Sequence, residues 1–425
     1  MSVRRHAPNS GRPSFSSQAR PAFRVLALLL AITAARAAAS QTFSIIHNFT
    51  GGAEGASPFA GLVMDAAGNL YGTTAFAGSY GAGTVFELKH SGSAWVLNPL
   101  YNFLGGQDGI MPYYGGVTFA PDGTLFGTTA QGGTNTEGCG DSGCGTAFHL
   151  TPQPDPPVTL LPSWNEDIIH NFSAYNDGWW PSSAVVFDST GALYGTTLEG
   201  SSSFGTIWKM TPSGGGWTEQ VLTTFSGAAG DGMYPYWGLT PDSAGNFYGT
   251  TNQGGAYSWG TIYELSPSGG QWSKTILYSF TNGSDGGLPI GGVVFDRWGN
   301  LFGATTERDS GGGTIYELSP SNGNWAFHTL YSFTGRGASG PWGNLLVDSN
   351  GDLYGSALAT DENVGVVFKL SHSSGAWTYT ALHSFGGSDG AYPYGTLVRD
   401  ASGNLYGTTN SGGEFNKGIV FEITP

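Results

Sequence analysis

Basic residues are scarce in this sequence, and charge of either sign is sparse. Of 425 residues, 15 are Lys or Arg and 30 are Asp or Glu, so charged residues make up 11% of the chain. Six of the Arg lie within residues 1–40, which leaves nine basic residues against all 30 acids in the remainder. Because so acidic a chain repels polyanions, we expect neither nucleic acid nor an anionic membrane surface as a partner.

Cysteine is almost absent. The two that occur, Cys139 and Cys144, stand in the stretch "TEGCGDSGCGT" with no His beside them, which makes a poor metal site. In an oxidising compartment such a pair forms a local disulfide, so we expect these two residues to close one long loop.

Long apolar runs are missing too. The run "VLALLLAITAA" at 25–35 is too short to span a bilayer, follows a basic segment and precedes the small residues "RAAAS". We interpret residues 1–40 as a signal peptide cut near Ala39 or Ser40, with an uncleaved anchor as the alternative. The expected location is therefore secreted, periplasmic or at the cell surface, without stable membrane insertion once the signal is removed.

Glycine and aromatic residues are abundant, with 71 Gly and 14% aromatics, which favours many short strands joined by Gly-rich turns. The phrase "GNLYGTT" occurs at 68–74 and again at 403–409, and five altered copies lie between them. Repeats at a fixed period indicate a repeat architecture. The aromatic residue of the seven copies falls at Tyr71, Phe126, Tyr194, Tyr248, Phe302, Tyr354 and Tyr406.

Each period holds four segments of strand character. The first resembles "GLVMD" at 61–65, the second is the repeated phrase, and the third resembles "GTVFEL" at 83–88. The fourth is a Trp followed eight residues later by Phe, as in Trp95 and Phe103. Only six such Trp–Phe pairs follow a third segment, and the seventh copy of the fourth segment is "QTFSIIHNF" at 41–49, ahead of all the others.

This offset predicts a closed ring, because the N-terminal strand would complete the last unit. We expect an all-β fold, a seven-bladed β-propeller with four antiparallel strands per blade, in which residues 41–49 join the C-terminal blade. A linear β-solenoid is the alternative. Residues 41–425 form a single domain in this prediction, with repeats near 58–103, 112–172, 181–225, 235–280, 289–333, 341–385 and 393–425 plus 41–49.

The recurring "GNLYGTT", "GTIYEL", "W…LYSF" and "DGxxP" strings make the chain resemble the GloVer tandem-repeat proteins, which are exported bacterial proteins. The resemblance covers Gln41 to Pro425. It implies export and a repeat architecture, and it implies no particular reaction. Many family members carry a C-terminal sorting tail, whereas this chain ends inside its last repeat, so we expect no such tail here.

The repeated phrase itself is expected to be a packing part rather than a ligand motif. We expect its Leu, Gly and first Thr on one face of the strand, and its Tyr and second Thr on the other. Its mid-strand Gly should leave room for an aromatic side chain of a neighbouring blade, or for a bulge.

On one face of the ring the connections are short. Each first turn carries an Asp that we expect to close an Asx turn with its own backbone. No cofactor is expected, although the turn "DSNGD" at 348–352 resembles the start of a calcium loop, so Ca²⁺ is an alternative there. The turn Asp residues are Asp65, Asp122, Asp188, Asp242, Asp296, Asp348 and Asp400.

On the other face, six of the seven longer connections contain an acid, a Gly and then a Pro. A ring of these carboxylates could bind a cation or sugar hydroxyls, whereas the alternative is that each Asp-Gly only makes a turn. The seventh connection, "GASGP" at 337–341, has lost the acid. The six acids are Glu54, Asp108, Asp177, Asp231, Asp285 and Asp389.

The same connections concentrate aromatic residues, which suit stacking on sugar rings or gripping a peptide. Packing between blades is the alternative use of these side chains. The candidate ligand-binding aromatics are Tyr114, Trp179, Trp180, Tyr236, Trp237, Trp259, Trp342 and Tyr394.

Catalytic motifs are not apparent. No nucleophile elbow or metal-spaced His cluster occurs, and His47, His170 and His383 share a fourth-strand position with Tyr and Thr in other repeats, which indicates a structural role. We therefore predict a monomeric, secreted ligand-binding propeller, with an extracellular glycan as its ligand. The alternatives are a polysaccharide lyase or glycosidase that uses Asp residues at the mouth of the ring, and an envelope scaffold that binds proteins.

Overall fold

The computed structural model describes residues 41–92, 94–153, 164–200, 202–307, 312–334, 340–358, 364–373 and 375–425. The predicted signal peptide, residues 1–40, lies outside this part of the chain. Within the described residues, no helix has the length and apolar character needed to cross a membrane. Thr42 to Thr424 form one compact unit.

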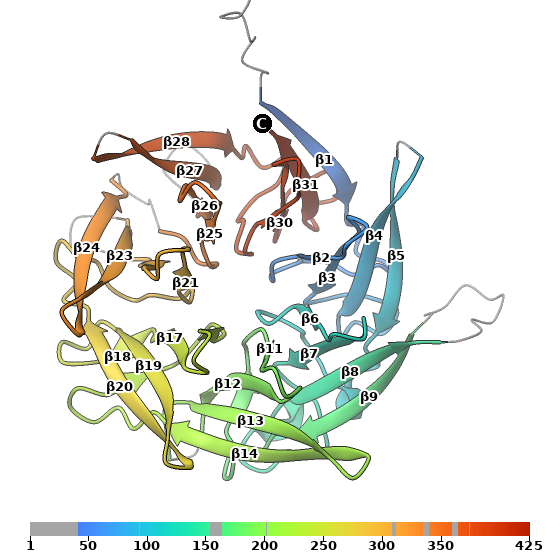
Figure 1. Ribbon diagram of the computed structural model, residues 1–425. Helices are drawn as coiled ribbons and strands as arrows, with labels where there is room; N and C mark the ends of the chain where they lie inside the picture. The colour runs from blue at the N-terminus through green and yellow to red at the C-terminus, as the bar shows by residue number, and fades with distance from the viewer. Residues whose placement is uncertain are drawn as a thin grey trace, which may run out of the picture. The chain divides into compact units, whose positions relative to one another are not determined.

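This unit is a seven-bladed β-propeller, as the sequence predicts, with four antiparallel strands in the main path of each blade. Figure 1 shows the sheets around a common centre, with the short first strands inside and the long fourth strands outside. In blades 1 to 7 the first strands are β2 (Val63–Met64), β6 (Val117–Phe119), β11 (Val186–Phe187), β16 (Thr240–Pro241), β21 (Val294–Phe295), β25 (Leu346–Val347) and β29 (Val398–Arg399).

The second strands carry the repeated phrase and are almost wholly buried. They are β3 (Leu70–Thr74), β7 (Leu125–Thr129), β12 (Leu193–Glu199), β17 (Phe247–Thr251), β22 (Leu301–Ala304), β26 (Leu353–Ala357) and β30 (Leu405–Thr409).

The third and fourth strands form long hairpins at the outside of the ring. The third strands are β4 (Thr84–Ser91), β8 (Thr146–Pro152), β13 (Thr206–Ser213), β19 (Thr261–Ser268), β23 (Thr314–Ser321), β27 (Val366–Ser373) and β31 (Ile419–Thr424). The fourth strands are β5 (Ala94–Asn102), β9 (Trp164–Asn171), β14 (Gly216–Thr224), β20 (Gln271–Ser279), β24 (Asn324–Ser332), β28 (Ala376–Ser384) and β1 (Thr42–Asn48). The connections add β10 (Trp179–Pro181), β15 (Gly232–Met233), β18 (Gln253–Gly254) and the 3-10 helices η1 (Gly106–Asp108) and η2 (Gly140–Ser142).

The ring is closed by the N-terminal strand. β1 pairs antiparallel with β31, from Thr42 opposite Thr424 to Asn48 opposite Ile419, and the sheet continues through β30 to β29. The first and last strands of this unit therefore share blade 7, which confirms the predicted closure and rules out the linear solenoid.

The repeated phrase is a packing part, and its polar groups clip neighbouring blades together. The hydroxyl of Thr73 in β3 donates a hydrogen bond to the carbonyl of Pro112 in blade 2, at 3.0 Å. Equivalent bonds run from Thr128, Thr196, Thr250, Ser356 and Thr408 to the innermost connection of the next blade, and Thr408 of blade 7 bonds to Ala60 of blade 1. Blade 5 has Ala304 at this position and therefore lacks the hydroxyl.

Two details of the expected packing are wrong. Because side chains alternate strictly along the strand, Thr73 lies on the same side as Tyr71 and faces the next blade, whereas Leu70 packs against Tyr406 and Val420 of the preceding blade. The mid-strand Gly also serves its own blade rather than a neighbour. A Cβ on Gly72 would lie 2.7 Å from the ring of Phe86, its partner across β3 and β4.

The innermost connections form a ring of glycines and other small residues. A Cβ added to any of these glycines would come within 2.6 to 3.4 Å of backbone oxygen or nitrogen in an adjacent blade. The contacts join all seven neighbouring pairs, and they are Gly61 with Thr396, Gly116 with Gly61, Gly115 with Ser183, Gly238 with Ala184, Gly292 with Gly238, Gly291 with Gly343, and Gly343 with Tyr394. Backbone thus packs directly on backbone around the centre.

Replacing one of these glycines should loosen the whole ring. In Gly395→Ala the new Cβ would lie 2.7 Å from the carbonyl oxygen of Ala60, so we expect the free energy of unfolding to fall by roughly 1–3 kcal/mol. Chemical denaturation measures the change. Gly216→Ala is the matched control, because the nearest atom to its Cβ lies 3.9 Å away. Equal stability of the two variants would contradict the role of the central ring.

Candidate functional site

The face with short connections is occupied by turns. In each turn the Asp carboxylate accepts backbone N–H groups two and, in most blades, four residues on, as Asp65 does from Ala67 and Asn69 at 2.9 Å, which confirms the predicted Asx turns. The equivalent bonds are made by Asp122, Asp188, Asp242, Asp296, Asp348 and Asp400. Where the repeated phrase has Tyr, its hydroxyl donates to the same carboxylate, as Tyr194 does to Asp188 at 2.9 Å.

The "DSNGD" turn is likewise engaged within the protein. Asp348 accepts the N–H groups of Asn350 and Asp352 and the hydroxyl of Tyr354, while the carboxylate of Asp352 lies 2.6 Å from the ammonium of Lys369. Nothing in this arrangement favours Ca²⁺ over the turn itself.

The six acids of the long-connection face also hold their own loops. Each carboxylate accepts a backbone N–H three to five residues earlier, and Asp108 accepts that of Leu104 at 2.7 Å. The same pattern ties Glu54 to Thr50, Asp177 to Ser173, Asp231 to Ser226, Asp285 to Thr281 and Asp389 to Gly386. Asp177 and Asp285 are buried, at 3% and 6% exposure. This geometry agrees with the turn interpretation of the acids rather than with a ring of free carboxylates.

At each interface between consecutive blades, beside the long connection, a residue near the end of one fourth strand faces a residue near the start of the next fourth strand. The structure fills this interface in different ways. Aromatic rings stack across three of them, where Phe43 covers His383, Phe327 covers Tyr278 and Tyr379 covers Tyr331. Between blades 3 and 4, Lys274 forms an ion pair with Asp231. Glu166 in blade 2 and Glu219 in blade 3 occupy the strand position that Lys274 has in blade 4. They lie near Asp108 and Asp177 respectively.

An acid beside an acid is costly when both are partly removed from water. Burial raises the pKa of Glu166 to about 8, and the negative charges of Asp108 and Asp167 add to the effect. One carboxylate oxygen of Glu166 and one of Asp108 are buried without a hydrogen-bond partner. Burial and the neighbouring carboxylates therefore favour the protonated form of Glu166 in the folded protein near neutral pH.

The raised pKa of Glu166 predicts a pH dependence of stability. The folded protein keeps a proton that the unfolded chain, with a Glu pKa near 4.5, has already released, so this residue destabilises the fold progressively as pH rises from about 4.5 to about 8. Glu166→Gln stays neutral and should flatten that part of the profile. Thermal unfolding of both proteins between pH 5 and pH 8 measures the difference, and parallel profiles would contradict it.

The residue before Pro in the long connections has an unusual backbone. Met111 and Trp180 have positive φ, as do Ser57, Tyr234, Leu288 and Tyr392 at the equivalent positions. Their N–H groups donate to the preceding blade, as Trp180 does to Cys144 at 3.1 Å. Positive φ is rare for bulky residues and persists only where the surroundings enforce it, often at functional sites.

A pocket of about 320 Å³ opens on this face beside the centre of the ring, across blades 2, 3 and 4. Its aromatic walls are Tyr113, Tyr114, Trp180 and Tyr236, and Met111 and Ser182 also line it. Each of the four aromatic side chains is half-buried, so one part packs and another part is presented. Burial raises the pKa of Tyr114 and Tyr236, so both remain neutral phenols that can donate hydrogen bonds.

Aromatic contacts continue from this pocket around the mouth. Phe59 of blade 1 stacks on Tyr113 at 4.0 Å and on Tyr394 at 4.2 Å, and Trp342 meets Tyr394 edge to face at 4.9 Å. The indole N–H of Trp342 is buried without a hydrogen-bond partner. An arc of aromatic side chains thus crosses blades 6, 7, 1 and 2.

The remaining predicted aromatics lie elsewhere. Trp237 is buried at 5% exposure, and Trp179 packs against the core between blades 2 and 3. Trp259 packs against the core between blades 4 and 5. Tyr113 belongs to the same aromatic stretch "MPYYG" as Tyr114, whereas the sequence pattern did not single out Met111 and Ser182, whose signal is their place beside the Pro of the repeated connection.

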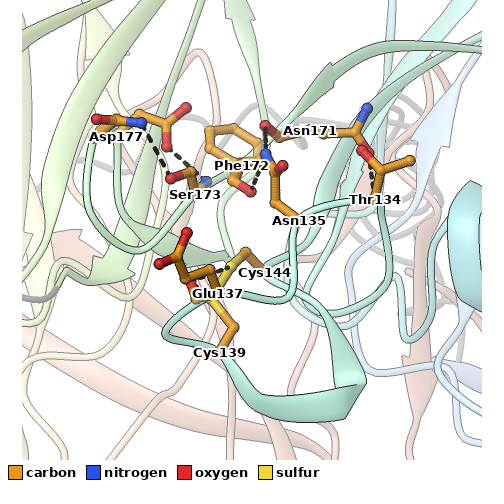
Figure 2. Close-up of a disulfide and its surroundings, with 10 residues drawn as sticks. Thr134, Asn135, Glu137, Cys139, Cys144, Asn171, Phe172, Ser173 and Asp177 are labelled. Atoms are coloured by element: carbon orange, nitrogen blue, oxygen red, sulfur yellow. Dashed lines mark hydrogen bonds between the residues drawn. A yellow bond between two sulfur atoms is a disulfide. The ribbon is translucent and has the colours of Figure 1, made fainter.

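The disulfide lies next to this region. Cys139 and Cys144 are bonded, as predicted, with their Cα atoms 5.2 Å apart. Figure 2 shows that the disulfide loop contacts the end of β9 and the connection that follows it. The Asn135 side-chain amide donates hydrogen bonds to the carbonyls of Asn171 at 2.9 Å and Phe172 at 3.1 Å. The bridge therefore supports the connection that carries Asp177 and Trp180.

Two further hollows lie on the short-turn face. The one between blades 3 and 4 has about 490 Å³, but its rings, Tyr194, Phe247 and Trp272, pack on one another. The one between blades 5 and 6 has about 250 Å³ and is lined by Trp298 and Trp377. Of these three pockets, the one on the long-connection face is lined by the largest number of aromatic side chains that are partly exposed to solvent.

The fold and the repeated connections define a tandem-repeat β-propeller. The chain matches the Gloeobacter/Verrucomicrobia repeat over residues 32–165, 136–356 and 242–425, so it belongs to that repeat family. Among curated proteins there is no significant match.

Several solved structures are similar to the chain at low sequence identity. A fungal alcohol oxidase in complex with copper is similar, with a TM-score of 0.55 and 14% identity over 91% of this chain and 76% of that one. An α-L-arabinanase from Penicillium chrysogenum, complexed with arabinobiose, has a TM-score of 0.39 and 14% identity over 72% and 91%. A protein of unknown function from Dyadobacter fermentans has a TM-score of 0.42 and 10% identity over 91% and 99%. The oxidase supports the fold alone, and no activity follows from these similarities.

Proposed function

We propose that this protein is an exported ligand-binding propeller that binds carbohydrate in the pocket formed by Tyr113, Tyr114, Trp180 and Tyr236. The observation that carries the proposal is this cluster of half-buried aromatic side chains beside the centre of the ring. Aromatic faces pack on the apolar faces of sugar rings, while phenol hydroxyls and Ser182 can exchange hydrogen bonds with sugar hydroxyls.

The surroundings of the pocket suit a large ligand. Among the described residues, most exposed large apolar side chains lie in the connections of the same face, whereas Trp298 lies in a short turn on the other face, and Ile45 and Val96 lie on the outer strands β1 and β5. Those on the long-connection face are Phe76, Tyr80, Leu104, Tyr175, Phe204, Tyr257, Tyr392 and Phe415. A polymer that runs from the pocket toward the rim would meet several of them, which favours an extracellular polysaccharide over a single sugar.

Binding is favoured over hydrolysis because the predicted acids are used within their loops. Asp108, Asp177 and Asp285 accept hydrogen bonds from backbone N–H groups of their own connections, and none of them lines the aromatic pocket. Glycoside chemistry needs two carboxylates on either side of the scissile bond.

A glycan panel with product analysis tests the proposal. We expect a polysaccharide to bind without new reducing ends or unsaturated products, and Trp180→Ala and Tyr236→Ala to weaken that binding at least tenfold, which corresponds to about 1.4 kcal/mol. Trp298→Ala on the opposite face is the matched control and should bind as the unmodified protein does.

Two outcomes would replace this function with another. Turnover of the polymer would identify an enzyme, and the absence of glycan binding together with specific capture of envelope proteins would identify a scaffold. Loss of binding in Trp298→Ala, with normal binding in Trp180→Ala, would move the site to the short-turn face.

A further inference from the structure

The outer interface between blades 3 and 4 contains a Lys at a position where the interface between blades 2 and 3 has a Glu. Lys274 on β20 lies 2.8 Å from the carboxylate of Asp231 in the preceding blade. Its ammonium also donates to the carbonyl of Thr224 at 2.7 Å and lies 4.0 Å from the centre of the Phe225 ring. A positive charge thus occupies the space between the loop carboxylate of one blade and the fourth strand of the next.

The interface between blades 2 and 3 has the same frame with a different residue at this position. Glu219 on β14 stands where Lys274 stands in the following blade, and Asp177 stands where Asp231 does. His170, at the end of β9, contacts the Asp177 carboxylate through Nε2. One ligand atom from each of these three side chains falls within 4.8 Å of the other two.

The surrounding protein fixes the position of this cluster. Asp177 is 3% exposed, and it is held at both ends, because its other carboxylate oxygen accepts the N–H of Ser173 at 2.7 Å and its carbonyl accepts the hydroxyl of Thr206 at 2.8 Å. One carboxylate oxygen of Glu219 is buried with no hydrogen-bond partner. Two carboxylates and one imidazole therefore face one another here, whereas the next interface has one carboxylate and the ammonium group of Lys274.

We propose that His170, Asp177 and Glu219 bind a divalent transition-metal ion of the zinc type between blades 2 and 3. One imidazole nitrogen with two carboxylate oxygens is a donor set that Zn²⁺ accepts, at bond lengths of about 2.0–2.2 Å. Ca²⁺ and Mg²⁺ prefer oxygen ligands alone, so the imidazole disfavours them. Small side-chain movements bring the three donors to these distances, and water can complete the coordination.

The ion has a structural role in this proposal. It joins the connection after β9 to β14 of the next blade, as the Lys274 ammonium joins blades 3 and 4. The same connection carries Trp180, three residues after Asp177, and leans on the disulfide loop. Metal binding therefore also fixes one wall of the aromatic pocket.

The repeats offer variants that should keep the fold while removing the ion. Glu219→Lys reproduces the Lys274 arrangement, and His170→Tyr introduces the residue that Tyr101 and Tyr278 provide at the same position in other blades. Glu219→Gln removes one negative charge with little change in shape. Glu166→Gln is the matched control, because it neutralises the equivalent acid between blades 1 and 2, where the facing residue is Tyr101 instead of His.

The full-length protein, treated with a chelator and dialysed, is titrated with ZnCl₂ by calorimetry and by thermal unfolding. We expect one ion per chain and a higher Tm with Zn²⁺ than with equal concentrations of CaCl₂ or MgCl₂. Binding should weaken at least tenfold in His170→Tyr and Glu219→Gln and vanish in Glu219→Lys, while Glu166→Gln binds as the unmodified protein.

Three results would overturn the proposal. They are the absence of Zn²⁺ binding to the unmodified protein, binding that Glu219→Lys leaves unchanged, and equal loss of binding in Glu166→Gln. In the first case a proton on Glu219 replaces the metal ion, since burial and the charge of Asp177 raise the pKa of this residue to about 7. Loss of glycan binding in Trp180→Ala bears on the aromatic pocket alone, so the two proposals fail separately.

Discussion

Contact between neighbouring blades at the centre of the ring is the constraint on which this structure depends. Seven sheets can share one centre only if backbone meets backbone there, and the glycines that precede the first strands allow this approach. The hydroxyl of Thr73 and its equivalents then tie six of the seven second strands to the next innermost connection. Because the ring returns from Thr408 to Ala60, the arrangement is cyclic, and each blade depends on both of its neighbours. The repeated phrase recurs because it supplies the buried second strand of every blade, and in six blades also the hydroxyl that bonds to the next one.

Much of this could be predicted from the sequence, since a packing requirement that recurs seven times leaves a recurrent pattern. The number of blades, the closure by β1, the Asx turns and the disulfide are all local or periodic features. The prediction is wrong about the face of the strand on which Thr73 lies, which follows from the strict alternation of side chains. It is also wrong about the side chain that Gly72 accommodates, which is Phe86 on the adjacent strand of the same blade. A contact that only one pair of neighbouring blades makes leaves no such pattern. His170 and Glu219 stand 49 positions apart on different blades, and only the fold brings them together.

The two faces of the ring use similar residues for different purposes. On the short-turn face each Asp closes its own turn, and in the five blades whose repeated phrase has Tyr, the Tyr hydroxyl also donates to that Asp. On the other face the acids also hold loops, but the residues around them differ from blade to blade, from stacked rings at Tyr278 to the ion pair of Lys274. Ligand recognition needs this kind of asymmetry, since identical blades would present identical surfaces. The aromatic pocket and the His170 cluster both lie where neighbouring blades differ.

The pairing of β1 with β31 has a consequence for the order of events in the life of the chain. Thr42 and Thr424 are opposite each other in one sheet, so the first strand of the domain to be synthesised finds its partner only when the last has appeared. Contacts between residues so far apart in sequence form slowly. Until then β1 has no partner strand, and the sheet of blade 7 stays incomplete. Completion of the ring therefore depends on β31, the last strand of the domain to be synthesised, whereas each of blades 1 to 6 is built from strands that are close together in the sequence.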